Sequence, residues 1–302
     1  ESSCAGDAAQ AAAEAEADSS RRSPPFRVLV GSEAALSAVA GFRIARGALA
    51  CGVAPRRDGA WLRKFLASRR RRRLGAAVST TGQKEGREGS RGTGNGNDDD
   101  DGSAGAGTRL LALDGVRDES NVGSAVRTAA AFGVAAVILS DDSADAWYRR
   151  SVRVSMGHVF TVPIVRVPDL AATLEEIKSG DSLADKDDAG VETGDGARDG
   201  TGVGAGAGAR AGAIEGIPSF GAVVDADAET ILERVGYGDI PPSWCCVIGN
   251  EGTGITRAVV EACSSRIRIG MTSGVDSLSV PVATGILLHG LSTREQVAGG
   301  MR

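Results

Sequence analysis

Short apolar runs alternate with amphipathic segments through residues 108–292, and few folds are compatible with that order. The apolar runs have the length of buried strands, and the segments between them have helical spacing. This alternation predicts an α/β fold with a mostly parallel sheet and helices on both faces. We expect strands over 109–113, 135–139, 159–165, 220–224, 244–248 and 266–269, and helices over 121–131, 169–178, 228–235, 256–263 and 280–291.

Composition limits how much of the chain can join such a core. Glycine supplies 43 of the 302 residues and aromatic residues only 4 %, which is unlike an evenly packed domain. Segments rich in Gly, Ser, Ala and Asp predict disorder or flexible linkers, because they cannot bury enough apolar surface. We expect two ordered parts: a partial N-terminal RNA-binding domain over 26–74 and a main domain over 108–292. The first should contain a strand over 26–30 and helical pieces over 34–39 and 61–67, and the second is interrupted by a low-complexity insert over 179–212. The rest is expected to be a disordered tail (1–25), a flexible linker (75–107) and a C-terminal tail (293–302).

The net charge of −5 excludes a uniformly basic nucleic-acid coat, but it hides a basic stretch. Residues 53–74 carry nine basic side chains against the single acid Asp58, a net of +8. Like charges this dense need a polyanion or water to relieve their repulsion, so we expect contact with an RNA backbone; a solvated linker and a targeting-like basic run are the alternatives. The candidate RNA-binding residues are Arg56, Arg57, Arg69, Arg70 and Arg71.

The five cysteines form neither an even disulfide set nor a CxxC pair, which indicates a reducing compartment and no structural zinc site. Adjacent Cys245 and Cys246 lie in an apolar run and are expected to be core thiols. No stretch of 18 consecutive apolar residues occurs, so no membrane span is predicted. The start at Glu1 rather than Met is compatible with the loss of a targeting segment, so localisation, an organelle included, stays open.

The first loop expected to carry chemistry lies within residues 114–133, where a strand ends and a helix begins. Asn121 is a candidate cap for that helix, Gly123 would let another backbone approach it, and Arg127 lies within two turns of its start. Free N–H groups and a guanidinium there favour an anion such as an RNA phosphate. A capped surface helix whose arginine pairs with a carboxylate is the alternative.

The second loop reads Val247-Ile-Gly-Asn-Glu-Gly-Thr-Gly-Ile255. Three glycines around one carboxylate indicate a backbone folded closely around a ligand, with Glu251 available for hydrogen bonding. No Lys-Ser/Thr pair follows, so this is not a phosphate-binding Walker loop; a structural strand-to-helix turn is the alternative. The third loop, within residues 267–288, leads from a strand into an apolar helix through Ser277 and Ser279.

Together and in this order, the three loops resemble the three signature motifs of the SpoU-type (TrmH-like) RNA ribose 2′-O-methyltransferases, members of the SPOUT superfamily. The resemblance covers residues 110–291 apart from the insert, and residues 147–157 are similar to the family's stretch between the first two motifs. Upstream, residues 41–57 resemble the end of the L30e-like substrate-binding domain that many of these enzymes carry.

The resemblance implies a parallel sheet whose C-terminal part forms a trefoil knot. Knots are nearly absent from proteins, so no pattern argument predicts one. It also implies a homodimer that uses S-adenosylmethionine, without a metal, and binds it through backbone and apolar groups of the knot loops. Carried over to this chain, the donor-binding residues are Gly249, Asn250, Gly252, Ile269, Met271 and Leu278.

The implied reaction is attack by a ribose 2′-oxygen of rRNA or tRNA on the donor methyl group, so the protein must position the ribose and aid proton removal. Arg127 matches the family's catalytic arginine, and because a free guanidinium is a poor base we expect it to bind the neighbouring phosphate. Asn121 and Glu251 match positions that hold this arginine and the substrate in place. Ser279 departs from the family's Ser-Leu-Asn motif.

Two other classes of function remain open at this point. The serine at 279 suggests a catalytically weakened relative that binds RNA without turnover. An unrelated nucleotide- or NAD-binding α/β protein is the third hypothesis, and the absence of G-x-G-x-x-G and Walker signatures weighs against it.

Overall fold

The structure, a computed structural model, describes residues 32–40, 52–80, 107–180, 216–225, 228–275 and 277–294, without the side chains of residues 40 and 74–80. The chain divides into two compact units, Glu1–Ala54 and Pro55–Arg302. The described part of the first unit contains helix α2 (Glu33–Ala40), which includes the helix predicted over 34–39. The predicted N-terminal tail and first strand, residues 41–51 of the L30e-like resemblance, and most of the linker, the insert and the C-terminal tail lie outside the described residues.

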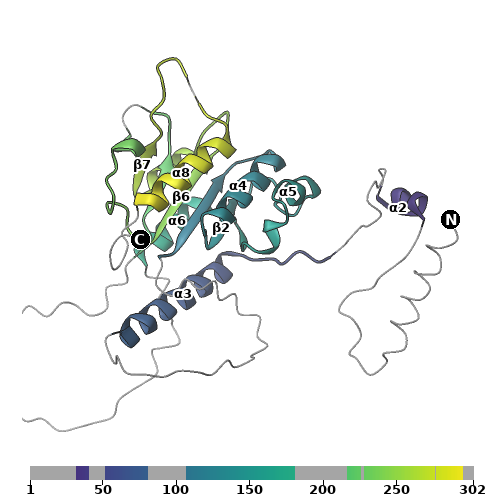
Figure 1. The fold of residues 1–302 in the computed structure, drawn as a ribbon, viewed down its shortest axis with the longest axis horizontal. Helices are drawn as coiled ribbons and strands as arrows, with labels where there is room; N and C mark the ends of the chain where they lie inside the picture. Colours follow the sequence, from purple (N-terminus) through teal and green to yellow (C-terminus); the bar gives the residue numbers. More distant parts are fainter. Residues whose placement is uncertain are drawn as a thin grey trace, which may run out of the picture. The chain divides into compact units, whose positions relative to one another are not determined.

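A seven-stranded sheet forms the centre of the second unit (Figure 1). Its strands are β1 (Arg109–Asp114), β2 (Ala136–Ser140), β3 (Ile164–Val167), β4 (Ser219–Ala222), β5 (Thr230–Ile231), β6 (Trp244–Gly249) and β7 (Ser265–Arg268). Their order is β3-β2-β1-β6-β4-β7-β5, and each neighbouring pair is parallel. The predicted α/β fold with a parallel sheet is confirmed.

Helices cover both faces of the sheet, and the side chains of each strand alternate between two buried clusters. On β1, Leu111 and Leu113 join one cluster, whereas Leu110 and Ala112 join the other. The first cluster packs against α4 (Glu119–Ala131), α5 (Arg149–Val154) and α8 (Val280–Arg294), and the second against α3 (Gly59–Thr80), α6 (Leu170–Ser179) and α7 (Arg257–Ala262).

The cysteines of this core are free and buried. Cys245 and Cys246 are neighbours on β6 and therefore point to opposite faces, one into each cluster. Burial raises the pKa of both thiols, and it raises the pKa of Cys263 to about 11. They are core thiols, as predicted, and not a redox pair.

Helix α3 packs onto the sheet of the second unit, although its residues 59–74 were predicted to belong to the N-terminal domain. Leu62 and Leu66 are buried in the second cluster, one turn apart on the helix. The helix predicted over 61–67 is therefore confirmed and extended. No helix in the described ranges, α3 included, has the length and apolar character needed to cross a bilayer.

The prediction of a strand over 159–165 is wrong for residues 159–163. Residues His158–Phe160 form a 3₁₀ turn, and β3 begins only at Ile164. Gly157 precedes this turn in the left-handed region, with φ 87°, and a turn rather than a strand follows from that conformation. Pro163, which has no N–H, stands directly before β3. The short helix α5 was not predicted.

The prediction of a helix over 228–235 is also wrong. Residues Thr230–Ile231 form β5, and residues Leu232–Arg234 form a 3₁₀ turn, η4. The Glu229 carboxylate accepts hydrogen bonds from the backbone N–H and the guanidinium of Arg266 on β7 at 2.8–3.1 Å. The side-chain bond from Arg266 lowers the pKa of Glu229 to about 2. Pairing with β7 therefore overrides the local helical pattern.

The variant Leu66→Ala tests whether α3 belongs to the fold of the second unit. Leu66 is 3 % exposed, so its truncation should leave a cavity and lower the free energy of unfolding by about 2–4 kcal/mol. Lys64→Ala, at an exposed position of the same helix, is the control and should change it by less than about 0.5 kcal/mol. Chemical denaturation followed by circular dichroism measures both. Equal stability of the two variants would show that α3 does not contribute to the core.

Candidate active site

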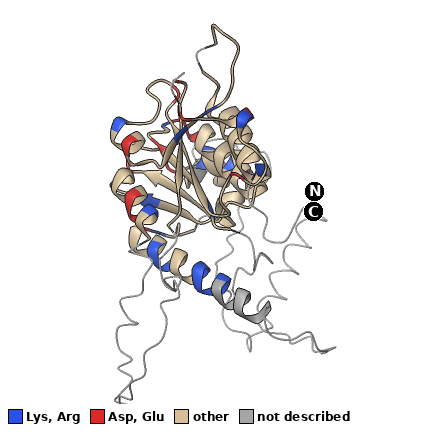
Figure 2. Ribbon diagram, turned by 90° about the vertical axis from the view of Figure 1, so that its left-hand side faces the viewer, with Lys and Arg blue, Asp and Glu red and all other residues tan. Residues whose placement is uncertain are grey.

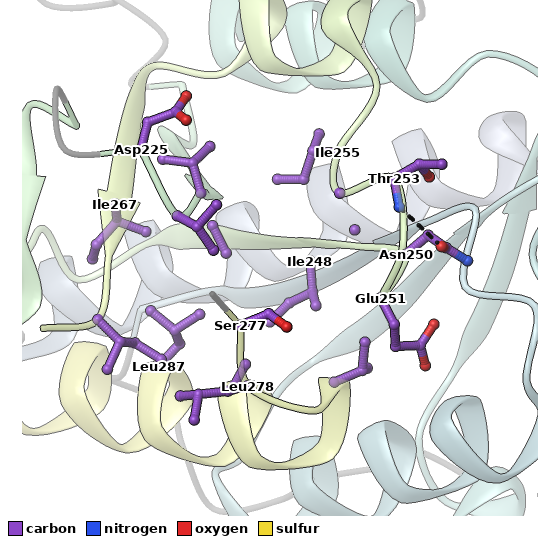
Figure 3. Close-up of a pocket in the computed structure, with 18 of the residues that line it drawn as sticks. Asp225, Ile248, Asn250, Glu251, Thr253, Ile255, Ile267, Ser277, Leu278 and Leu287 are labelled. Atoms are coloured by element: carbon purple, nitrogen blue, oxygen red, sulfur yellow. Dashed lines mark hydrogen bonds between the residues drawn. The ribbon is translucent and has the colours of Figure 1, made fainter. Parts of the chain in front are cut away.

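A pocket of about 450 Å³ opens at the carboxyl ends of β4, β6 and β7, where ligands bind in parallel sheets of this kind. Its walls are residues 222–225, 248–255 and 277–278, with apolar side chains of β7 and α8 between them. In Figure 3, Ile248 lies in the middle, Leu278 lies on the side of α8, and Asp225 lies on the opposite side.

All six predicted donor-binding residues line this one pocket: Gly249, Asn250, Gly252, Ile269, Met271 and Leu278. Asp225, which was not predicted, lines the same pocket. The signal that identifies it is its place directly after the run predicted as a strand over 220–224, because the carboxyl ends of neighbouring parallel strands meet at one edge. Among the residues that the structure describes, no three His, Cys, Asp or Glu side chains are grouped to hold a metal ion.

The loop after β6 folds back on itself. Asn250 and Gly254 exchange backbone hydrogen bonds at 3.1 and 2.9 Å. The Asn250 side-chain oxygen also accepts the N–H groups of Gly252 at 2.8 Å and Thr253 at 3.3 Å, the latter bond being drawn in Figure 3. A Cβ on Gly249 would lie 2.2 Å from the carbonyl carbon of Gly254, so the loop requires glycine there. The predicted closely folded backbone is confirmed.

Helix α4, which follows the loop after β1, is capped by Asp118 and not by Asn121. The Asp118 carboxylate accepts the N–H of Asn121 at 3.0 Å. Burial raises the pKa of Asp118, but hydrogen bonds from Asn121 and Ser120 and the charge of Arg150 together lower it. An ionised carboxylate at this helix end is favourable. The prediction for Asn121 is wrong because Asn121 lies one turn inside the helix, so that its backbone is the group that needs a cap.

The close approach predicted at Gly123 is confirmed. A Cβ on Gly123 would lie 2.5 Å from the carbonyl oxygen of Ser151, because α5 crosses α4 at this point. Any larger side chain would separate the two helices.

Three hydrogen bonds join the loop after β1 to the loop after β6. The Asn250 amide donates to the carbonyl of Gly115 at 2.9 Å, and the Asp114 carboxylate accepts the N–H of Thr256 at 2.7 Å. In the third, the Asn121 amide donates to the carboxylate of Glu251. The first two predicted motifs therefore form one structure at the edge of the sheet.

Of the four predicted catalytic residues, only Glu251 lines this pocket, while Asn121, Arg127 and Ser279 lie outside its lining. Arg127 is exposed on α4. Six residues of helix correspond to about 9 Å of rise and place Arg127 about 120° from Asn121 around the axis, so the two side chains point in different directions. Ser279 directly precedes α8, and its carbonyl accepts the N–H of Ala283 at 2.9 Å. The structure joins Asn121 to Glu251 and brings neither to Arg127.

A supporting set behind the first loop was not predicted. The hydroxyl groups of Ser140, at the end of β2, and Ser143, in the loop after it, accept the N–H groups of Gly115 and Val116 at 2.8 and 3.2 Å. The guanidinium of Arg166 on β3 donates to four carbonyl groups of the loop after β2 at 2.8–3.1 Å. A single arginine inside an apolar strand was the available signal, since such a side chain needs polar partners.

The candidate RNA-binding residues lie elsewhere in the second unit. Arg56 and Arg57 directly precede α3, and Arg69, Arg70 and Arg71 lie on it. None of these five lines the pocket. Any contact that they make with RNA is therefore separate from the pocket.

Comparison with known proteins places this geometry in a family. The model of the SpoU rRNA Methylase family matches residues 108–188 and 215–289, just over half of the chain. An uncharacterised tRNA/rRNA methyltransferase of Mycobacterium tuberculosis is 32 % identical over 185 residues, which are 61 % of this chain and 51 % of that protein. The 23S rRNA (guanosine-2′-O-)-methyltransferase RlmB of Vibrio vulnificus is 32 % identical over 179 residues, 59 % of this chain and 56 % of that protein.

Among solved structures, the SpoU methyltransferase AviRb of Streptomyces viridochromogenes matches with 21 % identity and a TM-score of 0.44, over 62 % of this chain and 57 % of that one. The chain spans about half the length of the curated relatives that it matches. The family model ends on the helix that closes the pocket and includes all three predicted motifs. On the strength of that match, the chain belongs to the SpoU rRNA methylase family.

Proposed function

We propose that this chain is an S-adenosylmethionine-dependent RNA methyltransferase that acts on a ribose 2′-hydroxyl of rRNA or tRNA. The observation that carries the proposal is the junction of the first two motifs. There Asn121 binds Glu251, a residue of the pocket that all six expected donor-binding residues line. The substrate class rests on relatives such as RlmB of Vibrio vulnificus, named as a 23S rRNA guanosine 2′-O-methyltransferase.

The pocket suits S-adenosylmethionine in size and chemistry. About 450 Å³ lies within the range of small-molecule sites. Ile269 and Leu278 offer apolar surface for an adenine, while Asp225 and Glu251 offer negative charge for an ammonium and a sulfonium. The bound donor would supply an electrophilic methyl group, and the close turn at Gly249 would bring backbone groups against it.

The residues of the chain would position the ribose. A guanidinium is a poor base, so the role of Arg127 is to bind the phosphate beside the target ribose and to hold that phosphate where it can accept the 2′-hydroxyl proton. Asn121 and Glu251 fix the first motif against the second. Orientation of this kind lowers the barrier because reacting atoms held in line need no further ordering.

A homodimer and a trefoil knot are part of the same proposal. Val282 and Ile286 on α8 are 49 % and 37 % exposed, which suits a second copy packing on that helix. Because Arg127 points away from the Asn121 of its own chain, it is also available to the active site of a second copy. Residues 277–278 line the pocket beside the loop after β6, and this return of the chain toward the centre of the sheet is compatible with a knotted path.

The free thiols favour a reducing compartment.

The variant Gly249→Ala tests the pocket as the donor site. The added Cβ would overlap the backbone of Gly254, so we expect the loop to move and donor affinity to fall by about tenfold or more, a loss of roughly 1.4 kcal/mol. Gly285→Ala is the control, since a Cβ there meets nothing within 4 Å. Calorimetric titration with S-adenosylmethionine, after thermal melts confirm that both variants fold, measures the difference. Normal donor affinity in folded Gly249→Ala would remove the pocket from the proposal.

The variant Arg127→Ala tests the role on the RNA side. We expect methyl transfer to RNA to fall by about 100-fold or more, because the ribose loses its orientation, while donor affinity stays unchanged. Arg127→Lys keeps the charge but not the planar fork, so its rate of methyl transfer should lie between that of the wild type and that of Arg127→Ala. Transfer of labelled methyl groups to ribosomal and transfer RNA gives the rate, and donor titration gives the affinity. Loss of donor binding in Arg127→Ala would contradict the assignment.

The variant Ser279→Asn restores the family residue at the one departure from its third motif. The amide adds a donor and an acceptor to the single hydroxyl that is present, so methyl transfer should be preserved or raised. Ser279→Ala, which removes the hydroxyl, is the comparison and should lower it. A sharp fall of the transfer rate in Ser279→Asn alone would mean that the site has adapted around serine.

A further inference from the structure

Three side chains of α3 and one side chain two residues before its start form a continuous stack along the helix, which we call the arginine–aromatic stack: Arg57, Trp61, Phe65 and Arg69. Each follows the previous one by four residues, the spacing that brings side chains together on one side of a helix. The Trp61 and Phe65 rings stack with centroids 4.8 Å apart and planes 16° apart. The Arg57 guanidinium lies 5.0 Å from the Trp61 ring centre, and that of Arg69 lies 5.7 Å from the Phe65 ring centre, both within cation–π range.

The stack is held in a fixed place because α3 is tied to the sheet at both ends. At its start, the carbonyl of Arg57 accepts the N–H of Arg166 on β3 at 3.1 Å. In the middle, Arg63 pairs with Glu176 of α6 at 3.1 Å. Toward the end of its described side chains, Arg73 donates to the hydroxyl of Ser243 at 2.7 Å. Ordering of the arginines therefore costs little entropy when a ligand arrives.

The charge of this surface is strongly positive. Helix α3 contains no acidic residue. In Figure 2 its described part shows several blue segments, which are Lys and Arg, and no red segment, which would be Asp or Glu. Trp61 and Phe65 are half-buried, so part of each ring remains accessible beside the guanidinium groups. A flexible polyanion with flat, apolar groups complements such a surface. Single-stranded RNA has both features, since its unstacked bases can stack on the arginine planes that the two rings hold in place.

The stack is distant from the candidate active site. The Arg57 end of the stack is bound to Arg166 on β3, and three strand spacings separate β3 from β6, at whose end the pocket begins with Ile248 and Gly249. Neighbouring strands lie ~4.8 Å apart, so roughly 14 Å separates β3 from the pocket edge at β6. An RNA bound at the stack would meet the protein away from the reacting ribose.

From these observations we infer that the arginine–aromatic stack of α3 is a second RNA-binding surface, which takes an unpaired strand outside the methyl-transfer pocket. The inference rests on the proposed function for its choice of RNA over another polyanion. It adds Trp61 and Phe65 to the RNA contacts that the arginines alone suggested. It also assigns this surface to affinity and not to the chemical step.

The test measures binding of the full chain to fluorescently labelled oligouridine and to an RNA duplex of the same length, by anisotropy at several salt concentrations. We expect the wild-type chain to bind the single strand more tightly than the duplex. The double variant Arg57→Gln/Arg69→Gln should bind the single strand about tenfold more weakly, with a less steep salt dependence, because two phosphate contacts are lost. Arg57→Lys/Arg69→Lys keeps the charge and loses the planar stacking, and it should lose the preference for the single strand.

Two matched controls isolate the stack from charge and folding. Lys64→Gln removes one charge from the same helix at a position about 60–100° away from the rings, and it should weaken binding less than Arg57→Gln. Trp61→Leu keeps an apolar side chain against the core and should reduce affinity for the single strand without lowering the melting temperature. Equal affinity of the wild-type and double-glutamine chains, or no binding of oligouridine by the wild type, would overturn the inference. Displacement of RNA by polyglutamate, with tighter binding of polyglutamate than of RNA, would do so as well and would indicate an acidic protein segment.

Methyl transfer to RNA, assayed in the same variants, separates this inference from the proposed function. If the inference holds, the double-glutamine variant should need more RNA for half-maximal transfer, while its rate at saturating RNA stays that of the wild type. Transfer that is normal at all RNA concentrations would reject the second surface and leave the proposed function standing. RNA binding through the stack in a chain that transfers no methyl group would reject the proposed function and leave the surface standing.

Discussion

The parallel pairing of β1 with β6 is the interaction on which the rest of the site depends. The register places Asp114 opposite Gly249, so the two loops that carry the first and second motifs leave the sheet side by side. Everything that joins them follows from that register: Asn250 reaches Gly115, Asp114 reaches Thr256, and Asn121 reaches Glu251. A shift of one residue would turn each side chain to the other face and separate these partners.

The register is itself secured by burial on both faces. Leu110 and Ala112 enter one cluster while Leu111 and Leu113 enter the other, so no slipped pairing keeps both clusters filled. The glycines then allow close approaches that larger side chains would prevent, at Gly249 within the loop and at Gly123 between two helices. Core packing thus sets the position of the loops, and glycine sets how closely they fold.

Helix α3 extends this arrangement to the other side of the sheet. Its apolar side contributes Leu62 and Leu66 to the second cluster, while its arginines remain near the surface. The same helix therefore stabilises the sheet that forms the pocket and carries a positive surface away from it. A family that acts on RNA needs contact with more than one nucleotide, and a rigid basic helix can supply it without disturbing the reacting groups.

The sequence by itself determined the fold class, because a parallel sheet buried on both faces requires apolar runs at β1, β2 and β6, and these are visible without coordinates. The resemblance of its motifs to those of the SpoU family also pointed to six residues between Gly249 and Leu278 that line one pocket. Only the tertiary structure decided the secondary structure of residues 228–235, where Glu229 binds Arg266 on another strand. Only it decided that Asp118 caps α4. Only it revealed that Arg166 holds the loop after β2. For residues 228–235 and for Arg166 the physical reason is that local patterns record which residues are buried, whereas partners far apart in the chain meet only when the sheet brings them together. The cap of α4 is local, and the residue at which the helix begins decides it.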